Sequence, residues 1–504
     1  MSSATDTTET TATPVDVRAQ AVDALPPAAA YIAGTYRTGS GGHHTHRDPA
    51  TGEELRSWSL CGPGEVDDAV VAAIPAQREW QGLEPGQRRD ALLALAETVA
   101  AHAQTLAALV SLEMGMPLRA SQAGVMAAVD WFRHYAGYAD KIEGAVPAVG
   151  SPSRTLDYTR YAPYGVVAAI IPWNGPAMAL ALKVAPALAA GNAVVLKPSE
   201  LAPFSSLYFG SLVTIAGLPN GLVNVVAGGA EVGARLCAHP AVAMISFTGG
   251  SVGGRAVAEA AAARHVPTVL ELGGKSASLV FPDCNVDRTA KLAAILGVAQ
   301  NSGQGCFLPT RLLVQRSIYD RTVEAVVAAA AKFRLGSPFD PGTTMGPVVD
   351  ERARERILDA IAAAERRGDG RLVHGGRRAA GSGLADGNFI EPTIFADVDP
   401  ASPLARDEVF GPVLSIIAFD DEADAVEIAN GTSFGLAGYI WTSDLGRAHR
   451  LADALEAGYV SVNGMAALPP AAPFGGWKAS GHGVEGGRHG LEEYLRIKNV
   501  HVQW

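Results

Sequence analysis

A glutamate and a cysteine stand 35 residues apart in two glycine-rich motifs of this sequence. Cys306 ends the run Gly303-Gln304-Gly305-Cys306, and Glu271 begins the run Glu271-Leu272-Gly273-Gly274-Lys275. A thiol that ionises to a thiolate can attack a carbonyl carbon, and a carboxylate can remove a proton from water. Together they are the minimum that covalent acyl chemistry ending in hydrolysis requires. An isolated cysteine is more often a buried apolar residue, so other motifs must decide between the two interpretations.

Three further motifs follow segments whose hydrophobic pattern predicts β-strands. In Ile171-Pro172-Trp173-Asn174-Gly175-Pro176, the Asn174 amide can donate to an oxyanion together with the backbone N–H of Cys306, or it is an ordinary turn asparagine. In Lys197-Pro198-Ser199-Glu200, the lysine and the glutamate either pair with each other or hold the ribose hydroxyls of a nucleotide. In Phe247-Thr248-Gly249-Gly250-Ser251, glycines at a helix N-terminus allow backbone N–H groups to approach a phosphate.

Three other patterns are set aside because of their surroundings. Gly481–Gly486 fits GxGxxG, but fewer than twenty residues follow it, so no βαβ unit can be completed. Gly431–Gly435 fits the serine-hydrolase elbow GxSxG, but it lies after a predicted helix and before a predicted strand, the reverse of the required order. His43, His44 and His46 lie in a Gly/Ser-rich stretch, which predicts a solvated loop and not a metal site.

The length and composition of the chain limit the class of protein. Its 504 residues exceed what one core usually holds, so two large domains are expected. A formal net charge of −11 without a basic stripe argues against nucleic acid or an anionic membrane as partner, and no apolar run is long enough to span a bilayer. Four cysteines without CxxC spacing predict a cytoplasmic protein without disulfides or zinc. Residues 1–29 are expected to be a disordered tail.

The pattern of apolar residues predicts two α/β regions. Ala-rich amphipathic helices are expected at 65–82, 86–114 and 118–143. Short β-branched runs alternating with helical stretches then predict a parallel, doubly wound sheet, with strands at 165–171, 193–197, 222–226, 242–247 and 268–271. Such a sheet binds ligands at the carboxyl ends of its strands, and four of these five runs end in one of the motifs above.

The second region carries Cys306 at its start. Its strands are expected at 310–316, 413–419, 436–442 and 458–462, and its helices at 317–334, 352–367, 422–430 and 445–456. Two more alternating segments, 155–162 and 495–504, have no obvious partner within either region. Because an exposed strand edge is a liability unless it is covered, these segments predict pairing between subunits.

Seven motifs of the chain resemble those of the aldehyde dehydrogenase superfamily in order and approximate spacing, over about residues 30–504. They are Pro172-Trp173-Asn174, Lys197–Glu200, Phe247-Thr248-Gly249, Glu271–Lys275, Gly303–Cys306, Glu408-Val409-Phe410-Gly411-Pro412 and Pro473-Phe474-Gly475-Gly476. Each motif alone is weakly specific, and the seven together are highly specific. In one departure, many members have serine where this chain has Gly250, so a phosphate contact there would depend on backbone N–H groups.

The resemblance implies a role for each motif. Cys306 would be the nucleophile, Glu271 the general base, and Asn174 with the backbone N–H of Cys306 the oxyanion donors. Lys197 and Glu200 would hold the adenosine ribose, whereas Glu408 would hold the nicotinamide ribose and Phe410 would pack near the nicotinamide. The residues expected to bind the cofactor are Pro172, Trp173, Lys197, Ser199, Glu200, Gly228, Phe247, Thr248, Gly249, Gly250, Leu272, Gly273, Glu408 and Phe410.

The resemblance also implies an α/β fold in three parts. An open parallel-sheet NAD-binding domain would comprise residues 30–143 and 163–273, and a catalytic α/β domain would comprise residues 274–488. A small β-extension of residues 144–162 and 489–504 would pair subunits into a homodimer or a tetramer.

The expected reaction is the NAD-dependent oxidation of an aldehyde to a carboxylate. NADP is less favoured, because Glu200 would repel a 2′-phosphate. The residues expected to line the acyl tunnel are Gly175, Ala179, Leu182, Phe307 and Leu468, with residues 465–467 beside them. No lysine or arginine stands among them, which favours an apolar, medium-sized to bulky aldehyde over a semialdehyde carboxylate. The alternative is that this surface is merely well-packed core and that selectivity is broad.

Two other classes of function stay open. One is a cysteine-dependent esterase or thioesterase that uses Cys306 and Glu271 without redox chemistry. The other is a non-catalytic structural member of the fold. The second is disfavoured, because a scaffold needs none of Cys306, Glu271 and Asn174.

Overall fold

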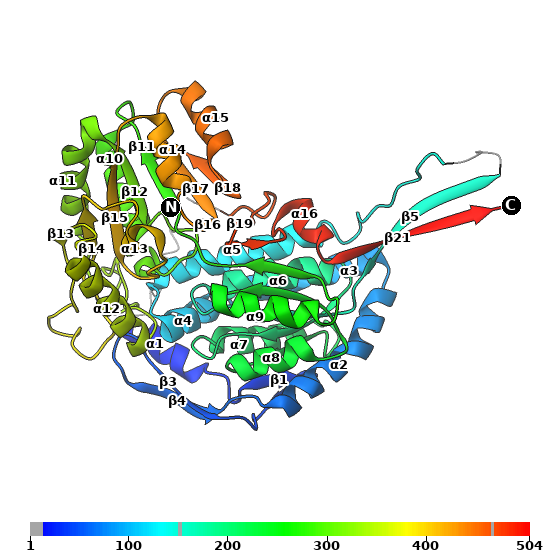
Figure 1. Ribbon diagram of the computed structural model, residues 1–504. Coiled ribbons are helices and arrows are strands. Elements are labelled where there is room, and N and C mark those ends of the chain that lie inside the picture. The colour runs from blue at the N-terminus through cyan, green and yellow to red at the C-terminus, as the bar shows by residue number, and fades with distance from the viewer. Residues whose placement is uncertain (1–13, 150–153, 465–467) are drawn as a thin grey trace, which may run out of the picture.

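Two open, mainly parallel β-sheets, each covered by helices on both faces, form the body of the computed structural model, which describes residues 14–149, 154–464 and 468–504. Figure 1 shows the two sheets side by side, with a two-stranded ribbon projecting away from them. The α/β fold class that the sequence predicts is confirmed.

The first sheet has eight strands in the spatial order β2-β1-β8-β7-β6-β9-β10-β20. The strands are β1 (Ala30–Ile32), β2 (Thr35–Arg37), β6 (Val166–Ile170), β7 (Ala193–Lys197), β8 (Val223–Val226), β9 (Val242–Thr248), β10 (Thr268–Glu271) and β20 (Gly481–His482). The strands from β8 to β10 are parallel neighbours, and they are apolar and buried on both faces, as a parallel sheet between helices requires.

The first sheet is doubly wound. From β6 the chain moves to β7 and β8 in one direction, then crosses back to β9 and β10 in the other. The connecting helices are α6 (Pro176–Ala189), α7 (Phe204–Ile215), α8 (Ala230–Ala238) and α9 (Ser251–Ala262). Because right-handed crossovers in opposite directions lie on opposite faces, α6 and α7 cover one face and α8 and α9 cover the other. The helices α2 (Pro63–Gly82), which contacts α8, and α5 (Leu118–Ala136), which contacts α6, complete the layers.

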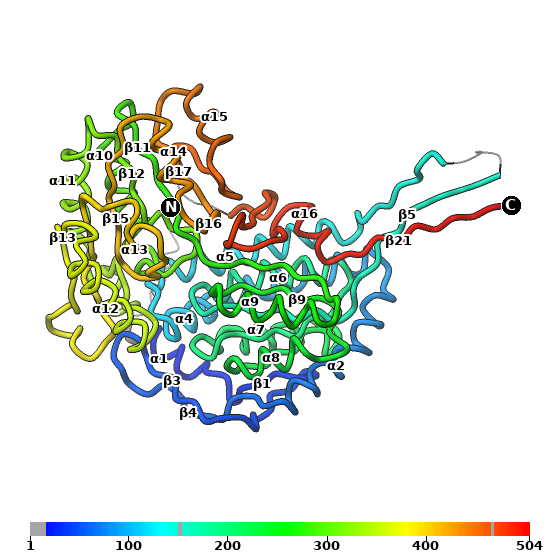
Figure 2. Tube along the Cα trace, in the orientation of Figure 1, coloured from blue at the N-terminus to red at the C-terminus, as the bar shows by residue number. Residues whose placement is uncertain are grey.

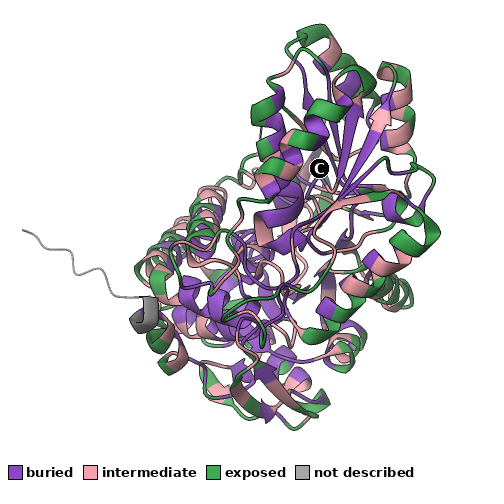
Figure 3. Cartoon of the chain, turned by 90° about the vertical axis from the view of Figure 1, so that its left-hand side faces the viewer, coloured by how far each residue is buried: buried purple, intermediate pink, exposed green. Residues whose placement is uncertain are grey.

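The second sheet has seven strands in the order β13-β14-β15-β12-β11-β17-β18. They are β11 (Ala277–Val280), β12 (Arg311–Gln315), β13 (Arg371–His374), β14 (Thr393–Ala396), β15 (Val413–Phe419), β17 (Ala437–Trp441) and β18 (Tyr459–Val462). Helices α10 (Val286–Ala294) and α11 (Tyr319–Ala330) pack on one face, and α12 (Glu351–Arg367), α14 (Glu422–Asn430) and α15 (Leu445–Ala454) on the other. Figure 3 shows these strands buried between helices whose outer surfaces are exposed.

Residues 155–162 and 495–504, for which the sequence suggests no partner strand, pair with each other. β5 (Thr155–Pro163) and β21 (Leu495–Gln503) run antiparallel, from Leu495 opposite Pro163 to Gln503 opposite Thr155. Figures 1 and 2 show that this ribbon extends beyond both sheets. The smaller elements are β3 (His43–Arg47), β4 (Glu54–Ser59), β16 (Phe434–Gly435), β19 (Trp477–Lys478), α13 (Pro403–Arg406) and α16 (Gly487–Glu492).

The expectation of a disordered tail over residues 1–29 is wrong from residue 14 onward. Residues 1–13 lie outside the described residues, but Pro14–Asp23 form helix α1. Val17 and Ala21 lie one helical turn apart and are buried, so α1 has an apolar face, and Leu25 just after the helix is buried as well. The Arg18 guanidinium also lies 2.9 Å from the Asp48 carboxylate.

The helix predicted over 86–114 is broken into two. α3 (Pro85–Ala101) and α4 (Ala103–Met114) meet at 64° around His102, which leaves the helical conformation and whose Nδ1 lies 2.8 Å from the Tyr208 hydroxyl. The following helix, α5, ends at Ala136 and not at residue 143. Within the described ranges no single helix is long and apolar enough to cross a membrane. The bent pair of α3 and α4 has the length and apolar composition of a membrane span, but only when the two helices are taken together.

Candidate active site

The motifs that follow β6, β7, β9 and β10 meet at one edge of the first sheet. Ile170 lies opposite both Lys197 and Phe247, and Thr248 lies opposite Glu271, so the carboxyl ends of the four strands are in register. The direction of winding changes between β6 and β9, which is where an open parallel sheet leaves a crevice for a ligand.

Cys306 lies against this edge, on the loop that precedes β12. The side-chain Nδ2 of Asn174 donates to the backbone carbonyl of Gln304 at 3.0 Å, two residues before the cysteine. On another side, Gly274 approaches the Cys306 carbonyl so closely that a β-carbon there would collide with it. The structure thus brings together the turn of Asn174, the segment after Glu271 and the thiol of Cys306.

The surroundings of Cys306 disfavour ionisation of its thiol. Burial and then the charges of Glu408 and Glu271 raise its pKa to about 12. At neutral pH the group is therefore the protonated thiol, which is a poor nucleophile. A cationic group beside the sulfur would lower the pKa and raise the thiolate fraction.

Glu271 is a buried carboxylate, and neither of its oxygens forms a hydrogen bond of normal geometry with the described residues. Burial and the charge of Glu485 raise its pKa well above the usual carboxyl range, whereas Lys183 and the nearby backbone N–H of Gly476 oppose this shift. β20, which the sequence places in the second region, pairs with β10 here, so that Gly481 lies opposite Glu271. An unpaired carboxylate with a raised pKa can accept a proton from water.

A buried ion pair of Lys183 and Glu485 lies close to Glu271. The Nζ of Lys183 lies 2.7 Å from Oε1 of Glu485 and donates to Oγ of Ser246 at 3.1 Å, and both charged side chains are buried. Neither residue has a sequence signal for this contact. Lys183 stands in an apolar helical run, and Glu485 lies inside the Gly481–Gly486 pattern that was set aside as a nucleotide motif.

The predicted ribose-binding residues at the end of β7 are close to one another. Oε2 of Glu200 lies 3.8 Å from Nζ of Lys197 and 3.5 Å from Oγ of Ser199. Lys197 is buried, which lowers its pKa, whereas the carboxylate of Glu200 is about one-third exposed. Gly228 precedes α8, and a β-carbon on it would collide with Val232. A β-carbon on the next residue, Gly229, would lie 3.9 Å from Oε1 of Glu200.

A second group of predicted cofactor residues lies across the crevice. Oε1 of Glu408 accepts from the backbone N–H of Gly274 at 3.1 Å, and the same carboxylate fills the space where Gly273 would need a β-carbon. The ring of Phe410, a residue with a φ of 51°, packs edge-on against Trp173 with the ring centroids 5.5 Å apart. Pro172 belongs to the same turn as Trp173.

The turn between β9 and α9 is partly open. Gly249 packs against the ring of Phe247, whereas nothing lies within 4 Å of where a β-carbon of Gly250 would be. Thr248 is the last residue of β9, and Leu272 directly follows β10. Leu272 contacts Gly254 of α9. Val252, which the sequence analysis did not single out, is 88% exposed in the first turn of α9.

The predicted tunnel residues differ in their surroundings. Gly175 has open space around it, whereas Ala179 and Leu182 on α6 are buried. The ring of Phe307 lies 6.1 Å from that of Phe474, and the carbonyl of Leu468 accepts from the indole N–H of Trp131 at 3.2 Å. Met465, Ala466 and Ala467 lie outside the described residues.

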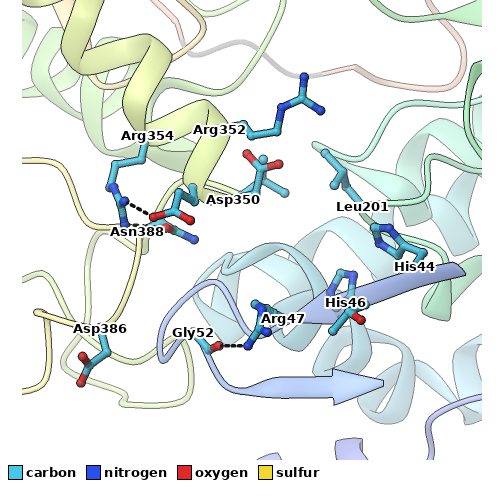
Figure 4. Close-up of a pocket in the computed structure, with 13 residues that line it drawn as sticks. His44, His46, Arg47, Gly52, Leu201, Asp350, Arg352, Arg354, Asp386 and Asn388 are labelled. Atoms are coloured by element: carbon cyan, nitrogen blue, oxygen red, sulfur yellow. Dashed lines mark hydrogen bonds and ion pairs between the residues drawn. The ribbon is translucent and has the colours of Figure 1, made fainter. Parts of the chain in front are cut away.

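The sequence predicts a solvated loop for the three histidines near residue 44, and this prediction is wrong. His43–Arg47 form strand β3, which pairs with β4, and His46 is buried against the ring of Phe204. His44 and His46 line a cavity of about 390 Å³. Figure 4 shows them on one side of it, with Asp350 and Arg352 at the N-terminus of α12 on the other side. Among the described residues no group of three or more His, Cys, Asp or Glu side chains is arranged to hold a metal ion.

Comparison with known proteins relates this geometry to one family. Residues 36–500 match the sequence model of the aldehyde dehydrogenase family. The chain is 41% identical over 478 residues to 3,6-anhydro-alpha-L-galactose dehydrogenase of Streptomyces coelicolor, and the aligned region covers 94% of this chain and 96% of that protein. It is also 41% identical over 460 residues to an aldehyde dehydrogenase-like protein of Schizosaccharomyces pombe, with 91% of each chain covered.

Solved structures agree with the sequence comparison. The fold is similar to that of betaine aldehyde dehydrogenase from Staphylococcus aureus in complex with NAD⁺, with a TM-score of 0.93 and 33% identity. The similarity covers 97% of each chain.

Proposed function

The chain belongs to the aldehyde dehydrogenase family and oxidises an aldehyde with a nicotinamide dinucleotide cofactor, and we propose that Cys306 and Glu271 carry out this reaction. The observation that carries the proposal is the convergence of three groups at one edge of the first sheet. These groups are the thiol of Cys306, the amide of Asn174 and the buried carboxylate of Glu271.

The first half of the reaction forms an acyl-enzyme. The Cys306 thiol first gives up its proton to water, a step that the positive charge of a bound nicotinamide ring would favour by lowering the pKa of the thiol. The thiolate then attacks the carbonyl carbon, and the oxygen of the resulting thiohemiacetal carries the negative charge. Asn174 and the backbone N–H of Cys306 donate hydrogen bonds to this oxyanion. A bound nicotinamide dinucleotide supplies the hydride acceptor. Loss of the hydride from carbon, with collapse of the oxyanion, leaves a thioester on Cys306.

The second half of the reaction is hydrolysis. The Glu271 carboxylate removes a proton from water, and the hydroxide adds to the thioester carbonyl. The carbon–sulfur bond then breaks, which releases the carboxylate product and regenerates the sulfur of Cys306. The raised pKa of Glu271 supports this assignment, because a carboxylate with a raised pKa is a stronger base toward water.

The residues at the crevice fit a dinucleotide. The open space at Gly250, at the start of α9, leaves room for a phosphate near backbone N–H groups. The carboxylates of Glu200 and Glu408 can accept from ribose hydroxyls, and the negative charge of Glu200 favours NAD over NADP. On this proposal, residues 30–143 and 163–273 form the NAD-binding domain and residues 274–488 the catalytic domain.

The proposed substrate is an apolar, medium-sized to bulky aldehyde. The open surroundings of Gly175 leave width at the tunnel wall, and the other proposed lining residues Ala179, Leu182, Phe307 and Leu468 are apolar. A lining without cations cannot compensate the desolvation of a distal carboxylate.

The proposed assembly is a homodimer or a tetramer formed through the ribbon of β5 and β21. The ribbon has no further strand beside it within the described residues, and Ile497 is 61% exposed on it. Pairing with another subunit would cover both the free edge and the apolar side chains.

The reaction is tested by initial rates at the nicotinamide absorbance, with NAD and a panel of aldehydes that includes betaine aldehyde and 3,6-anhydro-L-galactose. Cys306→Ala is expected to lose several orders of magnitude in kcat while NAD binding stays nearly intact. Retention of more than a few per cent of activity by Cys306→Ala would refute the assignment. Ester hydrolysis without any aldehyde-dependent cofactor reduction would instead favour the esterase alternative.

A further inference from the structure

Three successive residues before the Cys306 turn adopt left-handed backbone conformations. Asn301 has φ 50° and ψ 29°, Ser302 has φ 52° and ψ 40°, and Gly303 has φ 71°. Glycine adopts this region freely, whereas asparagine does so only occasionally and serine rarely. A segment of this kind persists only where surrounding contacts hold it.

Hydrogen bonds from buried side chains hold this segment against the loop that precedes α12. Oγ of Ser302 donates to the carbonyl of Gly346 at 2.7 Å. The side chain of Gln304, which is fully buried, accepts from the backbone N–H of Val349 at 3.0 Å and donates to the carbonyl of Asn301 at 3.0 Å. These contacts fix the loop, but they do not reach the motif on the first sheet.

Asn301 makes the connection to the first sheet. Its Nδ2 donates to the backbone carbonyl of Asn174 at 2.7 Å and to the backbone carbonyl of Gln304 at 2.8 Å. Nδ2 of Asn174 donates to the same Gln304 carbonyl at 3.0 Å. The two amides therefore share one acceptor, and Asn301 ties the backbone of Asn174 to the cysteine turn.

This arrangement determines how the Asn174 amide is oriented. One of its two N–H groups is used by Gln304, and rotating the amide by half a turn would set its oxygen against the Gln304 carbonyl. The second N–H stays available beside the Cys306 turn. We propose that Asn301 is a positioning residue, which holds the Asn174 amide so that its free N–H meets the oxyanion formed on the Cys306 adduct.

The residue type fits this task. Asparagine tolerates the left-handed region and offers two N–H donors to two carbonyl acceptors. Glycine would adopt the same backbone without the donors. Aspartate would keep the size and shape of the side chain but would place oxygens against both carbonyls.

The inference rests on the proposed function, in which Asn174 is an oxyanion donor, and a double-mutant cycle tests it. We expect Asn301→Gly to lower kcat about tenfold to a hundredfold, with KM, the Kd for NAD and Tm nearly unchanged. In an Asn174→Ala background the same substitution should lower kcat less than about threefold, because its effect passes through Asn174. Asp397→Gly is the matched control, since Asp397 also has a left-handed backbone (φ 54°) but lies at the far end of β14.

The outcomes separate this inference from the proposed function. Unchanged kcat in Asn301→Gly, or the same loss with and without Asn174, overturns the positioning role alone. Full activity in Asn174→Ala overturns the oxyanion assignment and the positioning role with it. If Asn301→Gly does not fold, Asn301→Asp takes its place in the cycle and is expected to show the same loss and the same dependence on Asn174.

Discussion

Lys183 and Glu485 form an ion pair directly behind Glu271, with Nζ of the lysine 2.7 Å from Oε1 of the glutamate and both side chains buried. The two partners act in opposite directions on Glu271, because Glu485 raises its pKa and Lys183 lowers it. Removing either partner would leave a buried charge unpaired, which costs about 3–5 kcal/mol. The pair that adjusts the pKa of Glu271, in addition to burial, is therefore one that the fold cannot easily lose.

We expect Glu271→Gln to stabilise the protein at higher pH. Burial is the main cause of the raised pKa, so the protonated carboxyl is favoured by folding. Its contribution to stability is complete below the pKa of the unfolded chain and is lost as the pH rises through the higher folded pKa. Glutamine stays neutral throughout. The gain in Tm over wild type should therefore grow with pH in calorimetry, and a gain that does not change with pH would contradict the raised pKa.

The same variant has a kinetic signature. Because an amide cannot deprotonate water, Glu271→Gln should release one equivalent of NADH per site in a burst and then stop. Mass spectrometry should show the acyl group retained on Cys306. Glu97→Gln, on the exposed face of α3, is the control and should turn over normally. A burst without a retained acyl group would show that Glu271 is not the base for hydrolysis.

Glu408→Gln should make Cys306 easier to ionise. After burial, the charge of Glu408 is the largest contribution that raises the pKa of the thiol, and glutamine removes this charge but can still accept from Gly274. The pH profile of alkylation by iodoacetamide should therefore shift to lower pH in the cofactor-free protein. Glu427→Gln on α14 serves as the control. An unshifted profile would mean that Glu408 does not face the thiol.

Local sequence features predicted the parts of the site that local structure creates. The strands β7, β10 and β15 occupy the predicted residues, because their β-branched runs are bounded by turn residues. β11 was missed, since four buried residues have no periodicity that separates strand from coil. His102 at the bend contacts Tyr208, 106 residues away in the sequence, and the Lys183–Glu485 pair joins residues 302 apart. Such contacts arise only when the chain is folded.

Glu200 should control the choice of dinucleotide. Its carboxylate is partly exposed and lies 3.8 Å from Lys197 Nζ, so it can accept from the ribose and would repel a 2′-phosphate. We expect kcat/KM to be higher with NAD than with NADP. Glu200→Gln should narrow this difference, because it should lower kcat/KM with NAD and raise kcat/KM with NADP. Equal efficiency with both cofactors in wild type, with no change in Glu200→Gln, would refute this role.

The ribbon should be the site of subunit assembly. Ile497 is 61% exposed in the single chain, so Ile497→Lys should cost little stability in a monomer but disrupt a subunit interface. Light scattering should show a smaller particle, with NAD binding retained. Ile215→Lys on α7 is a matched control, because Ile215 is 62% exposed and lies outside the ribbon. The same mass for wild type and Ile497→Lys would argue against the ribbon as the interface.

Gly175 should set the width of the aldehyde tunnel. Nothing lies within 4 Å of a β-carbon at this position, so a phenylalanine side chain can enter the open space without displacing the backbone. In wild type, kcat/KM should rise with each added methylene of an aliphatic aldehyde, by about 0.8 kcal/mol in transition-state binding until the pocket is full. Gly175→Phe should end this rise at a shorter chain and leave acetaldehyde little affected, whereas Gly82→Phe, at another glycine with open space and at the end of α2, should preserve the wild-type profile. A wild-type preference for acetaldehyde or succinic semialdehyde would refute the apolar assignment. An unchanged profile in Gly175→Phe would remove Gly175 from the tunnel wall.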